Sequence, residues 1–266
     1  MDQLTNHSPI VRSGVVDIGL IVPVLNEQTN LGALLGRLAT VLAGGRYTIC
    51  IVDDGSIDGT VELVEKRARH DQRVVLLQRS KTGSGCRRGG ASRAGLSWLL
   101  ANTTHAQFAD VDADGANRPE EVVQGIDLLA TTDADVVIAS KYVGGAVVTG
   151  RPVVRRLGSR IYNLTLRALI DWSIRDYSNT FRIYRRAAAQ LLERFDPLYD
   201  TPVYMVEMVA IWRSHGLRIV EMPTIYRERR VGTSKVVAGD FLRGAAGGVR
   251  VGLAYRAGRF RASRPL

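Results

Sequence analysis

Short apolar segments that alternate with helical patterns fill the first half of the chain and constrain its fold more than any other feature. The apolar segments cover residues 17–24, 47–52, 74–77, 106–111 and 134–139. Such alternation is typical of a mainly parallel sheet with helices on both faces and right-handed crossovers. The sequence therefore predicts an α/β fold whose ligand site lies at the carboxyl ends of the strands.

The second half has a different pattern, and we expect it to build the acceptor side of the site. Helical patterns lie near 153–171, 186–195 and 202–214, followed by a short strand pair around 217–228 and a helical tail. Five glycines interrupt that tail between Val236 and Tyr255, so packing or membrane contact must order it.

The chain is predicted to form one large domain, because no Pro/Ser-rich or charged linker interrupts its middle. We expect an extension at 1–16, the main domain at 17–236 and a basic segment at 237–266. Residues 1–16 lack the apolar run of a secretory signal, and no window reaches the ~18 uncharged apolar residues of a spanning helix. The expected location is the cytoplasm, with peripheral contact at the inner face of the membrane.

The charge of the chain favours polyanionic partners. Its formal net charge is +10, and no acid follows Asp240, whereas six arginines do. Nucleic acid, anionic lipid and phosphorylated substrates would all suit this charge. Because the basic residues lack interleaved aromatics and no nucleic-acid fold signature is present, we expect no nucleic-acid partner and a membrane-facing tail.

Acidic and amide side chains follow three of the predicted strands. Asp112 and Asp114 flank Ala113 after the fourth strand, and alternate residues of an extended chain point the same way. Two carboxylates could then share one Mg or Mn ion with a substrate diphosphate. The alternative is an exposed acidic turn that leads into the helix near Pro119.

Two further strand ends and a glycine-rich loop fall on the same rim. Asp53 and Asp54 could bind a base or ribose, or only build a turn. Asn26 and Glu27 could cap the first helix or face the ligand. Residues 81–90, which include Gly83, combine glycines with basic residues before a helix, as phosphate-contacting loops often do. No P-loop or dinucleotide-binding fingerprint is present.

Taken in order, these segments resemble family 2 inverting glycosyltransferases, which have the GT-A fold. The matching segments are PVLNE at 23–27, VDDGSIDGT at 52–60, the glycine-rich loop, Asp112-x-Asp114, and the later segments 178–184 and 229–235. The last two resemble the polyprenyl-phosphate branch, typified by dolichol-phosphate mannose synthase. The resemblance covers residues 17–236.

The resemblance implies transfer of a hexose, usually mannose from GDP-mannose, onto a polyprenyl phosphate with inversion at the anomeric carbon. The donor-binding residues it implies are Pro23, Asn26, Glu27, Asp53, Asp54, Gly83, Asp112, Ala113 and Asp114. The acceptor-phosphate residues it implies are Lys141, Arg155, Ser159, Arg229 and Lys235. Asp112, Asp114 and Arg229 would be catalytic, and Asp112 and Asp114 would bind Mg or Mn.

Three positions depart from the family pattern. Ala116 stands where a glutamine is usual, and Asn117 could replace it. Lys141 replaces an arginine, so a planar phosphate clamp becomes a point charge. The segment from Ser178 to Arg182 is one residue longer than its usual form. We expect these changes to affect metal binding, phosphate orientation and selectivity, respectively.

Two other functions fit parts of the sequence. A glycosyltransferase acting on a soluble sugar, peptide or natural-product hydroxyl would need a catalytic base, for which Glu207 is the best candidate. Glu207 could instead cap or pair locally. A non-enzymatic nucleotide- or nucleic-acid-binding module would rest mainly on the positive charge.

Overall fold

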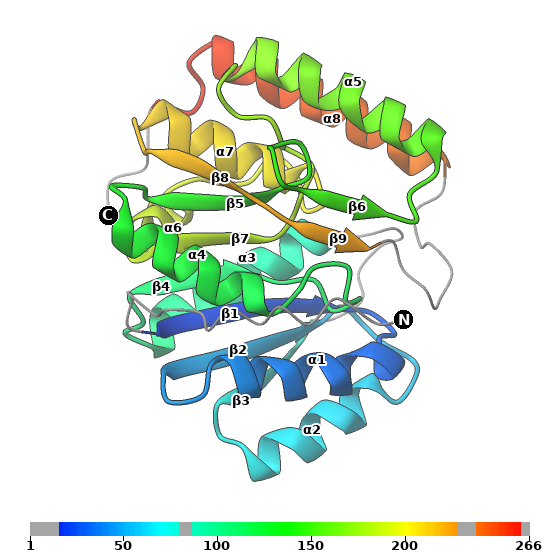
Figure 1. Cartoon of the computed structure of the whole chain (residues 1–266), viewed down its shortest axis with the longest axis vertical. Helices are drawn as coiled ribbons and strands as arrows, with labels where there is room; N and C mark the ends of the chain where they lie inside the picture. The colour runs from blue at the N-terminus through cyan, green and yellow to red at the C-terminus, as the bar shows by residue number, and fades with distance from the viewer. Residues whose placement is uncertain (1–15, 80–86, 228–237, 262–266) are drawn as a thin grey trace.

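A seven-stranded sheet forms the centre of the computed structural model, which describes residues 16–79, 87–227 and 238–261 (Figure 1). Its strands are β1 (Asp17–Val24), β2 (Arg46–Asp53), β3 (Val74–Gln78), β4 (Gln107–Asp110), β5 (Val136–Ser140), β7 (Arg182–Arg185) and β8 (Ile219–Pro223). The order across the sheet is β3-β2-β1-β4-β7-β5-β8, and every strand except β7 runs in the same direction. The predicted mainly parallel α/β fold is confirmed.

Helices cover both faces of this sheet. They are α1 (Gln28–Val41), α2 (Thr60–His70), α3 (Arg88–Asn102), α4 (Glu120–Thr131), α5 (Val153–Leu169), α6 (Arg186–Glu193), α7 (Tyr204–Ser214) and α8 (Ala238–Arg256). Leu20 and Val22 of β1 pack in one core with α1 and α4, whereas Ile21 between them packs in a second core with α3. This period of two explains why the buried strands are apolar throughout.

Two short strands lie in the predicted range 217–228, but they do not pair with each other. β8 joins the main sheet beside β5, and β9 (Ile225–Arg227) pairs in parallel with β6 (Val147–Thr149) in a separate two-stranded sheet. Thr224 separates β8 from β9, and its buried hydroxyl donates to Glu121 at 2.7 Å. This contact fixes the point where the chain leaves the main sheet. The sequence patterns also missed β6 and the antiparallel β7.

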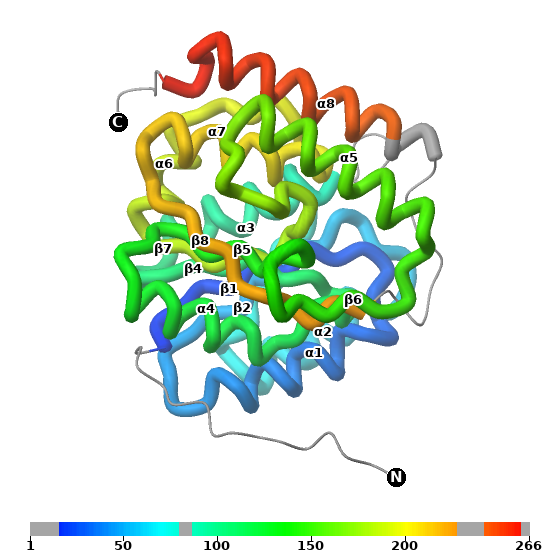
Figure 2. The backbone as a smooth tube through the Cα atoms, turned by 45° about the horizontal axis from the view of Figure 1, so that its top comes forward, coloured from blue at the N-terminus to red at the C-terminus, as the bar shows by residue number. Residues whose placement is uncertain are grey.

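Close packing orders the glycine-rich tail as helix α8. A Cβ atom added at Gly252 would lie 2.7 Å from Leu169 Cβ, and one at Gly248 would overlap Tyr162. These glycines let α8 approach α5, which it flanks in the outer layer (Figures 1 and 2). A bilayer-spanning helix must be both long and apolar, and no helix of the described residues is both.

Candidate active site

The carboxyl ends of β1 and β2 are tied together by Asn26. Its backbone N–H donates to the Ser56 hydroxyl at 2.8 Å, and its side-chain oxygen accepts from the Ile57 N–H at 2.8 Å. Asn26 has a φ of 51°, a left-handed conformation that asparagine tolerates better than most residues. The first two strand ends therefore form one joined rim, as the parallel topology predicts.

The helix-capping role considered for Asn26 and Glu27 is wrong. Glu27 occupies the N-cap position of α1, but neither side chain caps it. The Glu27 carboxylate is buried and accepts from the side chain of Asn30, whereas the first helical N–H, at Gln28, donates to Asp58. Asp58 also accepts from the Thr60 N–H at 3.0 Å, so its carboxylate links the starts of α1 and α2.

The two neighbouring aspartates at the end of β2 have different surroundings. Asp53 is buried, and its carboxylate accepts from the backbone N–H groups of Gly55 and Ser56. Gly55 has a φ of 92°, which explains the glycine in this turn. Asp54 pairs with Arg79 at 2.9 Å; burial raises the pKa of Asp54, and Arg79 opposes that rise. Asp53 therefore shapes the turn, and Asp54 is the acid held at its edge.

Asp112 and Asp114 lie in a turn and not on extended chain, because β4 ends at Asp110. Arg88 at the start of α3 lies 2.5 Å from Asp112 Oδ1, and the Thr180 hydroxyl donates to Oδ2. Asp114 Oδ1 accepts from the Ala116 N–H at 3.0 Å. Both aspartates are half-buried, whereas Ala113 between them is buried.

The donor set at this turn fits a cation that takes its other ligands from a diphosphate. Among the described residues, no three Asp, Glu, His or Cys side chains form a group that could hold a metal alone. Mg²⁺ in phosphate-transfer sites is usually bound by one or two carboxylates plus substrate phosphates. Asp112 and Asp114 offer that number of carboxylates at the rim.

The start of α3 brings positive charge to the same turn. α3 begins at Arg88, as the glycine-rich loop predicts, and Arg87 pairs with Asp200 at 2.9 Å. A Cβ atom added at Gly89 would lie 2.4 Å from the Thr201 carbonyl oxygen, so this position needs glycine. Gly83 lies outside the described residues.

Asn117, the suggested substitute for the glutamine that the family pattern would place at Ala116, contacts the residue between β8 and β9. Its side-chain N–H donates to the buried Thr224 hydroxyl at 2.9 Å, and Thr224 donates in turn to Glu121. Ala116 is itself buried, and its carbonyl accepts from the Arg227 N–H. These contacts anchor β9 beside the Asp112–Asp114 turn, and they use the side-chain N–H of Asn117, so a ligand role for its oxygen stays a prediction.

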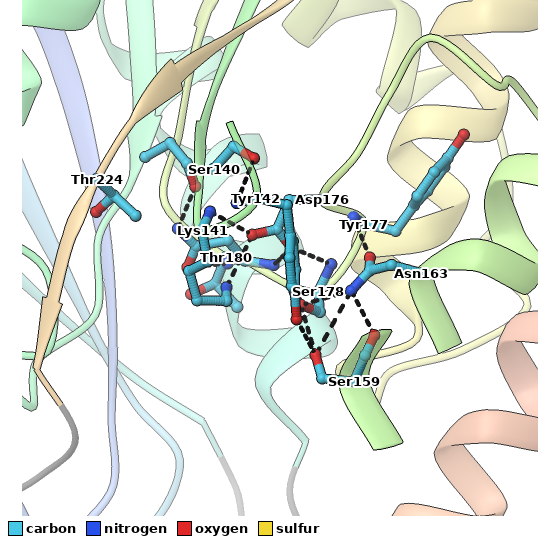
Figure 3. A network of polar contacts seen from close by, with 12 residues as sticks. Ser140, Lys141, Tyr142, Ser159, Asn163, Asp176, Tyr177, Ser178, Thr180 and Thr224 are labelled. Atoms are coloured by element: carbon cyan, nitrogen blue, oxygen red, sulfur yellow. Dashed lines mark hydrogen bonds and ion pairs between the residues drawn. The ribbon is translucent and has the colours of Figure 1, made fainter. Parts of the chain in front are cut away.

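A buried ion pair forms the centre of a polar network that contains Lys141 and Ser159, two of the predicted acceptor-phosphate residues (Figure 3). We call this the acceptor-side network. Lys141 Nζ lies 3.0 Å from Asp176 Oδ2, and the two side chains are 5% and 0% exposed. Burial lowers the pKa of Lys141, and Asp176 opposes that shift. Burial alone would raise the pKa of Asp176, but Lys141 and several hydrogen bonds bring it below its usual value.

The hydroxyl of Ser159 belongs to the same network. Ser159 Oγ lies 2.6 Å from the Tyr142 hydroxyl and 3.5 Å from Ser178 Oγ (Figure 3). Ser178 Oγ donates to Asp176 at 2.8 Å, and Asn163 donates to the Ser159 carbonyl. Lys141 and Ser159, which the family resemblance suggested as acceptor-phosphate residues, thus belong to one network.

Several members of this network were not predicted. Asp176 and Asn163 have no motif of their own, whereas Tyr142 directly follows Lys141 in the segment that departs from the family pattern. The position of Asp176 just before the segment Ser178–Arg182 could also have drawn attention to it. Within that longer segment, Asn179 donates to the Ala139 carbonyl and Thr180 to Asp112. The segment therefore connects the acceptor-side network to the turn that carries Asp112 and Asp114, two of the predicted donor-binding residues. We call this turn the donor-side turn.

Four predicted residues remain, namely Arg155, Arg229, Lys235 and the candidate base Glu207. Arg155 is exposed on the first turn of α5. Arg229 and Lys235 lie outside the described residues. Glu207 is 1% exposed and accepts from the N–H groups of Leu198 and Tyr199 at 2.7 and 3.0 Å. Glu207 therefore bonds locally to the loop before α7 and caps no helix.

Comparison with known proteins identifies the family. The model of Glycosyl transferase family 2 matches residues 20–192, more than half of the chain. The chain belongs to glycosyl transferase family 2. It is 35% identical to the polyprenol monophosphomannose synthase of Mycolicibacterium smegmatis over 222 residues, which are 82% of this chain and 80% of the relative. It is 31% identical to the undecaprenyl-phosphate mannosyltransferase of Micrococcus luteus over 237 residues, 89% of this chain and 94% of the relative.

Solved structures confirm the GT-A fold of this family 2 protein. Glucosyl-3-phosphoglycerate synthase from Mycobacterium tuberculosis, in complex with Mn²⁺, UDP and glucosyl-3-phosphoglycerate, matches with a TM-score of 0.63 and 19% identity. That match covers 92% of this chain and 81% of the synthase. TarS from S. aureus matches with a TM-score of 0.55 and 19% identity, over 80% of this chain and 60% of TarS.

Proposed function

We propose that this family 2 glycosyltransferase transfers a hexose, mannose from GDP-mannose, onto a polyprenyl phosphate. The names of the two relatives, a polyprenol monophosphomannose synthase and an undecaprenyl-phosphate mannosyltransferase, support the sugar and the acceptor class. The observation that carries the proposal is the Lys141–Asp176–Ser159 network, which puts a cation and hydroxyl groups beside the donor-side turn.

The described residues of that network offer no good general base, and a phosphate acceptor does not need one. A sugar hydroxyl needs a general base, whereas a phosphate oxygen is already anionic near neutral pH. Asp176, the carboxylate in the described network, is fully buried and already accepts from Lys141, Ser178 and Asn179. Glu207 is turned into the core. Both are therefore poor candidates for a base.

The proposed reaction is an in-line displacement. A phosphate oxygen of the acceptor forms a bond to the anomeric carbon, the bond from that carbon to the donor diphosphate breaks, and the nucleoside diphosphate leaves with the electron pair. Lys141, Arg155 and Ser159 orient the acceptor phosphate, together with Arg229 and Lys235. Inversion at the anomeric carbon follows from attack opposite the leaving group.

The donor side is assigned to the joined rim. Asp54 is proposed to bind the nucleoside, and Asp53 to hold the turn that presents it, with Pro23, Asn26, Glu27 and Gly83 completing the donor site. Asp112, Ala113 and Asp114 are proposed to face the diphosphate. A divalent cation, Mg or Mn, held by Asp112 and Asp114 would stabilise the negative charge on the departing diphosphate.

A product assay tests this proposal. The purified chain is incubated with GDP-mannose or other nucleotide sugars, a polyprenyl phosphate, and Mg or Mn, and the lipid-linked product is identified by mass. A thermal-shift panel with the same nucleotide sugars reports donor binding independently. Formation of a polyprenyl-phosphate hexose supports the proposal. Transfer to a soluble acceptor with no requirement for polyprenyl phosphate would contradict it.

A further inference from the structure

Helix α5 exposes a row of aliphatic side chains. Leu157 and Ile161 are each 58% exposed, and Val154 is 82% exposed. The complete row is Val153, Val154, Leu157, Ile161 and Leu164. At about 100° per residue, these five positions fall within an arc of about 100° on one side of the helix. We call this row the α5 stripe.

The opposite side of α5 faces the acceptor network. Ser159, Asn163 and Leu166 are buried there, and Ser159 and Asn163 are members of that network. An ordinary surface helix buries its apolar row and exposes its polar side. Helix α5 instead buries two polar residues of the candidate site and exposes five of its aliphatic residues, so interior packing does not account for the α5 stripe.

Positive charge borders the α5 stripe. Arg156 and Arg160 are exposed on one edge of it, on the same side of the helix as Arg167. Arg167 stacks on the ring of Trp172 at 4.4 Å, and this tryptophan is 59% exposed just beyond the end of α5. Tryptophan and arginine are both favoured at the boundary between lipid and water.

The position of α5 in the molecule leaves this stripe accessible. Helices α5 and α8 lie side by side in the outermost layer, at the opposite end of the long axis from α2 (Figures 1 and 2). Helix α8 packs along the edge of α5 that carries Tyr162 and Leu169, away from the stripe. Leu242 and Leu253 of α8 are also exposed, at 70% and 55%.

We propose that the α5 stripe docks on the surface of a bilayer that contains anionic lipids. The aliphatic row would enter the boundary between headgroups and acyl chains, and the bordering arginines would pair with lipid phosphates. Charge argues against a second copy of this chain as the occupant. Two α5 faces would bring like-charged arginines together, and the chain carries a net charge of +10.

Docking through the α5 stripe also has a consequence for catalysis, and this consequence rests on the proposed function. Ser159 lies across α5 from the stripe, and a helix with its side chains is only about 10 Å thick. A polyprenyl phosphate keeps its phosphate near the headgroups of the membrane. Docking through the α5 stripe would therefore bring the acceptor network close to the layer where that phosphate resides.

Vesicle flotation of the full chain tests the docking surface without donor or acceptor substrate. The vesicles contain phosphatidylcholine alone or mixed with phosphatidylglycerol. We expect wild-type protein to float with the anionic vesicles and Leu157→Gln/Ile161→Gln to lose at least tenfold in the bound-to-free ratio. Arg156→Ser/Arg160→Ser should weaken binding chiefly to anionic vesicles and at low salt. Ile57→Gln, at an 86% exposed position between β2 and α2, should bind as wild type.

Unchanged flotation of Leu157→Gln/Ile161→Gln would overturn the proposal. Failure of the wild-type protein to float would also overturn it. The same holds if the wild-type protein does not float but sediments as a dimer, and Leu157→Gln/Ile161→Gln dissociates that dimer. Circular dichroism checks that the variants are folded. Transfer to a detergent-solubilised, short-chain polyprenyl phosphate separates docking from catalysis. The stripe variant should retain activity there and lose it on vesicles, whereas failure of the proposed function would abolish wild-type activity in both assays.

Discussion

Thr180 donates a hydrogen bond from its hydroxyl to the carboxylate of Asp112, and Arg88 lies 2.5 Å from the other oxygen of that carboxylate. Thr180 belongs to the segment that also carries Ser178, a partner of Asp176. The donor-side turn and the acceptor-side network are therefore joined through this short segment. A substitution at Thr180 should therefore alter the rate of transfer, although Thr180 is neither a predicted donor-binding residue nor a predicted acceptor-phosphate residue.

Thr180→Val removes this hydroxyl and keeps the branched shape of the side chain. A hydrogen bond to a charged group contributes about 1.5–3 kcal/mol, so we expect kcat/KM for transfer to fall about tenfold or more. Thr180→Ser keeps the donor and should retain most of the activity. Thr131→Val, which removes a hydroxyl from the exposed end of α4, is the remote control. Wild-type kinetics for Thr180→Val would show that the contact has no role in turnover.

Asp114→Asn separates the charge of this side chain from its role in the turn. An asparagine oxygen can still accept from the Ala116 N–H, but the negative charge is lost. We expect transfer to fall on the order of 100-fold and the metal-dependent thermal stabilisation by the donor nucleotide to disappear. Asp133→Asn changes a 97% exposed carboxylate and should affect neither measurement. If the donor nucleotide and metal stabilised Asp114→Asn as much as wild type, Asp114 would not be a ligand of the cation.

The parallel strands made much of the donor side predictable from the sequence. Asn26 and the Asp53–Asp54 pair lie far apart along the chain from Asp112, but each follows a strand whose carboxyl end reaches the same edge. Contacts that depend on chain reversal were not predictable in this way. The antiparallel strand β7 brings Thr180 to Asp112 through pairing with β4 and β5, which has no local sequence signal.

Asp176→Asn tests the buried ion pair. Removing one partner of such a pair leaves an uncompensated charge, here on Lys141, at a cost of about 3–5 kcal/mol. We expect the free energy of unfolding, measured with urea, to fall by roughly this amount. Asp133→Asn breaks the exposed contact with Arg218 and should cost about 0–1 kcal/mol. Equal stability of the two variants would contradict a buried, charged Lys141–Asp176 pair.

Glu207 should make the stability of the fold depend on pH. Burial raises the pKa of this carboxyl from 4.5 to about 7. The folded protein therefore binds a proton more tightly than the unfolded chain. The contribution of Glu207 to the free energy of unfolding is therefore largest below about pH 4.5 and declines as the pH rises to about 7. The decline amounts to about 1.4 kcal/mol for each unit by which the folded and unfolded pKa values differ.

Glu207→Gln removes the titration and keeps one hydrogen-bond acceptor. We expect its free energy of unfolding to vary less than that of wild type between pH 4.5 and 7. Glu65→Gln, at an exposed position on α2, should keep the wild-type pH dependence. The measurement is urea unfolding at several pH values. A wild-type slope in Glu207→Gln would mean that another group causes the dependence.

Two glycines of α8 allow a matched test of how this helix is held. An alanine Cβ at Gly252 would lie 2.7 Å from Leu169 Cβ, whereas nothing lies within 4 Å of the same position at Gly244. Alanine favours a helix over glycine by about 1 kcal/mol, so Gly244→Ala should stabilise the protein slightly. Gly252→Ala should destabilise it by about 1–3 kcal/mol, because Leu169 Cβ is close to the α5 backbone and cannot move without it. Thermal unfolding of the two variants compares these effects directly. If both substitutions stabilised the protein, helix propensity would govern α8, and the close packing against α5 would not.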